Sequence, residues 1–102
     1  MDASAASSGP PVGVRYVMVA RLSRDGIESF VRYEEIVLPL LTEHGGHLEQ
    51  RLRSPDGLRE VHVLWFPSPE AFEEYRSDYR RTAHKHLLDD SGATTEVFEV
   101  SI

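Results

Sequence analysis

The 102-residue chain contains no cysteine. Disulfide bonds, thiolate chemistry and cysteine-ligated zinc are therefore excluded. No stretch approaches the ~20 apolar residues of a membrane-spanning helix. The first residues, Met1 to Gly13, carry an acid and lack the apolar run of a secretory signal. We therefore expect a cytoplasmic protein that does not enter a membrane.

Positive charge is also scarce. Eleven Lys and Arg residues stand against 17 Asp and Glu residues, which gives a formal net charge of −6. Binding to a nucleic-acid backbone needs clustered Lys and Arg. The one basic cluster, between Arg76 and Lys85, is interleaved with Asp78 and His84. We interpret it as a solvated helix face and expect no nucleic-acid partner.

The length leaves room for one domain with a thin core. Residues 1–13 are rich in Ala, Ser, Gly and Pro and have no patterned apolar residues. We therefore expect a flexible tail over residues 1–13 and a single domain over residues 14–102.

Within this domain, strand and helix patterns follow one another as strand, helix, strand, strand, helix, strand. β-Branched and aromatic residues predict strands, and apolar spacing with capping residues predicts helices. The predicted strands are 14–22, 47–53, 58–66 and 94–102, and the predicted helices are 25–44 and 68–88. Asp25 and Glu28 have capping-box spacing, Pro39 predicts a break in the first helix, and Gly45 predicts its end.

Short connections require both helices to cover one face of an antiparallel sheet. The predicted fold is therefore α+β, a ferredoxin-like βαββαβ domain. Strands 14–22 and 58–66 are apolar on both faces, so the uncovered sheet face should be apolar as well. A second copy of the chain is the simplest cover, and we predict a homodimer.

Two stretches resemble a known superfamily. VLPLLTEHGG at residues 37–46, and EVHVLWFPS at 60–68 followed by EAF at 70–72 and Tyr75, resemble the dimeric α+β barrel proteins. Among these, DUF1330-type proteins are the most similar, and NIPSNAP proteins and antibiotic-biosynthesis monooxygenases share the second stretch. The resemblance implies a ligand pocket between the sheet and the helices. The monooxygenase branch usually carries histidines after the third strand, where this sequence has Tyr75 and Tyr79.

Glu34 is the acid that we expect to face inward. On a helical wheel at ~100° per residue it falls within the apolar stripe around Phe30, whereas Glu35 points away. An acid on that side is costly unless it is paired or lines a wet cavity. Glu34 therefore either pairs with an arginine such as Arg15 or Arg21, or acts as a pocket acid or base with a raised pKa.

Two histidines are further candidates. His86 shares a face with Tyr75 and Tyr79 if the second helix is continuous, and there it is either a pocket group or a capped core residue. His62, in the middle of strand 58–66, faces either the pocket or the dimer barrel, where Glu60 or Arg59 of either subunit would pair with it. No metal-ligand spacing is convincing, and a composite site of Glu34, His62 and His86 is the one conceivable arrangement. We expect no metal and no cofactor.

These residues, together with what the resemblance implies, predict a cofactor-free enzyme for a small aromatic or polyketide-like natural product. General acid–base chemistry would drive enolisation, followed by cyclisation, isomerisation or reaction with oxygen. The predicted catalytic residues are Glu34, His62 and His86, and the predicted substrate-binding residues are Tyr16, Phe30, Trp65, Tyr75 and Tyr79. A non-catalytic homodimer that binds a ligand or a partner protein is the main alternative. Haem binding through His62 or His86 is a third.

Overall fold

The computed structural model describes residues 12–101, so residues 1–11 of the predicted tail lie outside the described residues. Its strands are β1 (Val14–Arg21), β2 (His47–Arg53), β3 (Arg59–Phe66) and β4 (Thr94–Val100). Its helices are η2 (Arg24–Gly26), α1 (Ile27–Val37), η3 (Leu38–His44), α2 (Pro69–Arg76), α3 (Tyr79–Ala83) and α4 (Lys85–Ser91), where η marks a 3-10 helix. The predicted order of strands and helices is confirmed.

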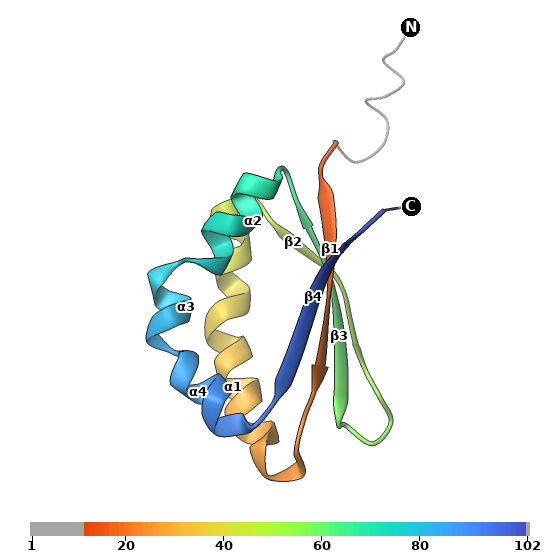
Figure 1. Ribbon diagram of the computed structural model, residues 1–102, viewed down its shortest axis with the longest axis vertical. Helices are drawn as coiled ribbons and strands as arrows, with labels where there is room; N and C mark the ends of the chain where they lie inside the picture. Colours follow the sequence, from red (N-terminus) through yellow and green to blue (C-terminus); the bar gives the residue numbers. More distant parts are fainter. Residues whose placement is uncertain (1–11, 102) are drawn as a thin grey trace, which may run out of the picture.

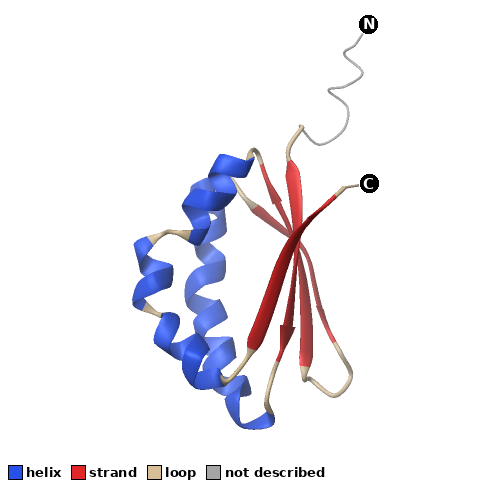
Figure 2. Ribbon diagram, in the orientation of Figure 1, coloured by secondary structure: helices blue, strands red, loops and turns tan. Residues whose placement is uncertain are grey.

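The four strands form one antiparallel sheet in the order β2-β3-β1-β4. All helices lie on one side of this sheet, and no described part of the chain covers the other side (Figures 1 and 2). This is the predicted ferredoxin-like α+β fold. None of the described helices is both long and apolar enough to cross a membrane.

Alternation along the strands sorts residues between the two faces of the sheet. The register aligns Met18 of β1 with His62 of β3 and with Val97 of β4, so these three side chains share the helix-facing side. Along each strand, the residues immediately before and after these three point to the uncovered side. That side carries Val17, Val19, Leu52, Val61, Val63 and Phe98. The apolar character predicted for the uncovered face is confirmed.

Strand β2 departs from the strict alternation that its sequence suggests. A register shift between Leu48 and Gln50 pairs Leu48 with Leu64, but Arg51 with His62. Strict alternation over 47–53 would put Leu48 and Arg51 on opposite sides, but the shift puts both on the helix-facing side. The β-bulge brings Arg51, and with it Arg53, onto the helix-facing side.

The first helical segment changes character at Pro39, as predicted, because α1 ends at Val37 and a 3-10 helix follows. Gly45 ends that helix in a left-handed conformation with φ of 74°. The predicted capping box is wrong. Asp25 lies in the 3-10 turn η2, and Gly26 precedes α1 without a side-chain cap.

The second helical segment is broken at Ser77 and Asp78. Ser68 caps α2, with its hydroxyl accepting a hydrogen bond from the Ala71 N–H at 3.1 Å. Asp78 then caps a new helix, α3, by accepting from the Arg80 N–H at 2.9 Å. The new cap restarts the helix in a different phase, so residues beyond it no longer follow the face of α2.

Candidate functional site

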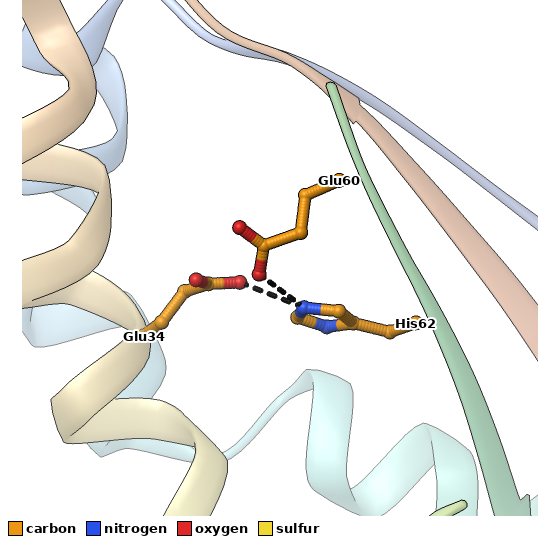
Figure 3. A group of neighbouring side chains, drawn as sticks. All are labelled: Glu34, Glu60 and His62. Carbon is orange, nitrogen blue, oxygen red and sulfur yellow. Dashed lines mark hydrogen bonds and ion pairs between the residues drawn. The ribbon is translucent and has the colours of Figure 1, made fainter. Parts of the chain in front are cut away.

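Two acids and a histidine meet between α1 and β3. Glu34 points from α1 toward the sheet, and Glu60 and His62 point from β3 toward the helix (Figure 3). Glu60 and His62 share a face because they are two residues apart on a strand. All three side chains are buried, with 3% or less of each residue exposed. We call them the Glu34–Glu60–His62 cluster.

One histidine nitrogen serves both acids. Nε2 of His62 lies 2.7 Å from Oε1 of Glu60 and 3.0 Å from Oε2 of Glu34. A single N–H cannot donate well to two acceptors, and Glu34 is the acid that it leaves without a hydrogen bond. Its Oε2 is buried and has no hydrogen bond of acceptable geometry with any residue in 12–101. Glu34 Oε2 is thus an acceptor without a donor, and such atoms are rare in folded proteins.

Two arginines of β2 neutralise the two acids. Arg51 donates to Glu34 Oε1 at 2.7 Å and to Glu60 Oε1 at 2.9 Å, and Arg53 donates to Glu60 Oε2 at 2.8 Å. The expectation that Glu34 pairs with an arginine is confirmed, but the residue is Arg51, brought by the bulge in β2, and not Arg15 or Arg21. Buried carboxylates need such partners, since an unpaired buried charge is strongly destabilising.

This arrangement fixes the charge states of His62 and Glu60. Burial alone would lower the pKa of His62, but hydrogen bonds and the negative charges of Glu34 and Glu60 outweigh it and raise that pKa. Burial also works against the ionised form of Glu60, yet hydrogen bonds from His62, Arg51 and Arg53 lower its pKa to about 2. Glu60 therefore stays ionised, and His62 holds its second proton to a higher pH than a free histidine.

A cavity of about 390 Å³ lies beside the cluster. Glu34 and His62 form part of its wall, and aromatic and aliphatic side chains form most of the remainder. They include Met18, Phe30, Tyr33, Leu64, Phe72 and Tyr75. Glu60 is not part of the lining, so it contacts His62 but not the cavity. A mostly apolar cavity with a few convergent polar groups is typical of a small-molecule site.

The structure places four of the eight predicted site residues at this cavity: Glu34, His62, Phe30 and Tyr75. Tyr16 lies in the neighbouring aromatic core, stacked on Phe72 with ring centroids 3.7 Å apart.

The other three predicted residues also lie away from the cavity, so with Tyr16 four predictions of position are wrong. Tyr79 is 77% exposed and His86 is exposed, because the restart at Asp78 turns both away from the cavity. Trp65 is buried on the opposite face of β3 from Leu64, where it stacks on His47 at 5.5 Å.

Sequence reasoning placed Glu60 only as a partner of His62 on the barrel side, and it missed Arg51 and Arg53. The one available signal was the Glu60-x-His62 alternation, which puts both side chains on the same face whichever face that is. The bulge that delivers Arg51 has no comparable sequence signal.

The cluster also has the composition of a metal site, since ligand atoms of Glu34, Glu60 and His62 lie within 4.8 Å of one another. Three of the four carboxylate oxygens, however, already accept hydrogen bonds from Arg51 or Arg53, and only Glu34 Oε2 does not. A metal ion would have to displace these guanidinium groups and bind beside their positive charge. The chemistry of the donor set therefore favours a proton over a metal ion, and the conceived site with His86 is wrong because His86 lies at the surface.

No protein-family model matches the chain, and no curated protein matches it at a significant level. Solved structures do resemble it. SnoaB, a cofactor-independent oxygenase from Streptomyces nogalater, has a TM-score of 0.66 at 17% identity, covering 88% of this chain and 92% of SnoaB. A NIPSNAP family protein of unknown function from Agrobacterium tumefaciens has a TM-score of 0.61 at 19% identity, covering 87% and 88%.

A candidate antibiotic biosynthesis monooxygenase from Caulobacter crescentus has a TM-score of 0.68 at 11% identity, covering 88% of this chain and 92% of that protein. Identities this low show a shared fold. The chain has the ferredoxin-like α+β fold of these proteins, which confirms the resemblance to the NIPSNAP and monooxygenase branches at the level of the fold.

Proposed function

We propose that this protein is a cofactor-free enzyme that enolises a small aromatic or polyketide-like carbonyl compound by general acid–base catalysis. The observation that carries the proposal is the unpartnered Oε2 of Glu34, 3.0 Å from the nitrogen of His62, at the wall of a largely aromatic cavity. A paired base and acid beside such a cavity are the elements that proton transfer requires.

The proposed chemistry assigns one role to each group. Glu34 Oε2 removes a proton from the carbon next to the carbonyl, and the C–H electron pair becomes the new C=C bond. His62 gives the carbonyl oxygen a proton from Nδ1, which forms no hydrogen bond with residues 12–101, while Nε2 stays hydrogen-bonded to Glu60. The product at this stage is an enol, with Glu34 protonated and His62 neutral.

Three reactions can follow from the enol. Return of the proton to another carbon gives isomerisation, attack on a second carbonyl gives cyclisation, and reaction with dioxygen gives oxygenation. That SnoaB is a cofactor-independent oxygenase on the same fold supports the third route. The reacting pair would be held in position and in its charged state by Glu60, Arg51 and Arg53. These three residues would not touch the substrate.

Exchange of a carbon-bound proton with solvent deuterium tests the enolisation step without knowledge of the natural substrate. A panel of aromatic 1,3-dicarbonyl compounds would be incubated with the protein in deuterium oxide and followed by NMR. We expect accelerated exchange for at least one compound over buffer alone. Binding of panel compounds without any accelerated exchange would contradict the proposal and favour a non-catalytic ligand-binding protein.

We also propose that the protein is a homodimer joined through the uncovered sheet face. The apolar residues on that face, among them Val61, Val63 and Phe98, support the proposal because a monomer would leave them in water. We expect light scattering to give twice the 11.5 kDa chain mass.

A charge placed on that face should separate the copies. Val61→Glu puts an acid on this face and should yield a monomer, whereas Thr42→Glu, at an exposed position of η3, should leave the mass unchanged. A wild-type monomer at micromolar concentration would refute the dimer.

A further inference from the structure

The wall of the cavity on the side of the α2–α4 segment is basic. Arg76, Arg81 and Lys85 line it. Arg76 and Lys85 are exposed and pair with Glu73 and Asp89 of their own segment. Arg81 differs from both. Its guanidinium lies over the ring of Tyr75 at 4.5 Å, and it has no carboxylate within 4.0 Å among residues 12–101.

Arg81 is also incompletely hydrogen-bonded. Its Nε is buried and has no hydrogen-bond partner among the residues that the structure describes. The chain carries 17 acids and a net charge of −6, so carboxylates are not in short supply. Arg51, Arg53 and Arg80 each bind one or more of them. A buried donor without an acceptor is costly, and such a group in a native structure calls for an explanation.

The helix break explains how Arg81 reaches this position. Asp78 caps α3 and also binds the side chain of Arg80, which extends to Glu43 on η3. The neighbouring Arg81 then turns inward onto Tyr75. The nearby acids Asp78 and Glu43 therefore bind Arg80, and the guanidinium of Arg81 is left without a carboxylate partner.

We infer that Arg81 binds a carboxylate of the substrate. A planar guanidinium matches a carboxylate with two parallel N–H···O bonds, and a ligand carboxylate would supply the acceptor that Nε lacks. For the reaction that follows binding, the inference rests on the proposed function. It narrows the substrate class to carbonyl compounds that also carry a carboxylate.

The charges also set the orientation of that substrate. A ligand carboxylate could not hydrogen-bond to Glu34 Oε2, which is itself an acceptor, whereas Arg81, with Arg76 and Lys85 at the rim, would attract it. The carboxylate would therefore lie at Arg81 and the reacting carbonyl at His62. A cavity of about 390 Å³ suits a ligand of one or two rings.

A matched pair of probes tests this inference by binding alone. The probes are 1-hydroxy-2-naphthoate and its methyl ester, which differ in one negative charge, and calorimetry measures their dissociation constants. We expect wild-type protein to bind the acid about 10- to 100-fold more tightly than the ester, the scale of a hydrogen bond to a charged group. Arg81→Met should abolish that preference, and Arg81→Lys should retain part of it because the charge remains.

Arg32→Met is the control, since Arg32 is exposed on α1 and is not among the residues that line the cavity, and it should keep the preference. Equal binding of acid and ester by wild-type protein would overturn the inference, as would an Arg81→Met variant that still prefers the acid. Should Arg81→Met fail to fold, the wild-type ratio and Arg81→Lys still decide. The acid preference without any proton exchange would refute the proposed enzyme and leave the anion site standing. Proton exchange without a preference for the acid would refute the anion site and leave the proposed enzyme standing.

Discussion

Replacing His62 with asparagine should slow proton exchange of an accepted carbonyl compound by about 10²–10⁴-fold, the usual contribution of a general acid or base. Asparagine keeps a polar group of similar size but cannot carry a proton to the carbonyl oxygen. Glu34→Gln should cause a loss of the same order, because an amide cannot accept the carbon-bound proton. The two changes together should cost far less than the product of the single losses, since the groups act as a pair.

The chain offers matched controls for both changes. His86→Asn alters an exposed histidine, and Glu35→Gln alters the exposed acid next to Glu34. Both should retain the wild-type exchange rate. A loss in these controls equal to that in His62→Asn would show that the effect comes from the fold and not from the site. Full activity in His62→Asn would remove His62 from the reaction.

Replacing Arg51 with methionine should lower the free energy of unfolding by about 3 kcal/mol, the lower end of the cost of breaking a buried ion pair. Methionine preserves much of the apolar stem but leaves Glu34 without an arginine and Glu60 with only Arg53. The lower end applies because the Arg51 side chain is 41% exposed, so water screens part of its charge. Urea unfolding near neutral pH measures the effect.

The pH dependence of this loss has a definite sign. Glu60 has a pKa of about 2 in the folded protein, below its ordinary value, so its ionised form stabilises the fold above about pH 4.5. That contribution is lost as the pH falls toward 2. Arg51→Met weakens the same contribution, so the difference between variant and wild type should shrink at about pH 3.5 relative to neutral pH. Arg32→Met, an exposed arginine of α1, should change stability little at either pH. A loss in Arg51→Met that stays constant with pH would point to packing as its cause.

The sequence was sufficient to predict that Glu34 faces inward. It was not sufficient to place His86, which lies at the surface. Residues 27–37 form one unbroken helix, so the wheel phase that joins Glu34 to Phe30 survives in the structure. In the second helical segment the hydrogen bond from the Arg80 N–H to Asp78 starts a new helix. A single local hydrogen bond of this kind shifts every later residue, and no periodicity reveals it.

The surroundings of His62 were beyond sequence reasoning for a different reason. Strand β3 is apolar on both sides, so its pattern does not say which side faces the helices. The partners of His62 come from α1 and from its own strand, and the arginine that binds both acids comes from β2 through a bulge. Contacts between elements so far apart in sequence depend on tertiary packing. The order of strands and helices does not, and it was predicted correctly.

The central claim is that Glu34 and Glu60 together hold a proton on His62 at the wall of the cavity. A ¹⁵N-resolved NMR titration of the histidine side chains measures this directly. We expect His62 to lose its second proton at a higher pH than a free histidine, and Glu34→Gln to lower the midpoint of His62. A His62 that titrates at or below the pH of a free histidine, or that is indifferent to Glu34→Gln, would show that the two acids do not hold the proton.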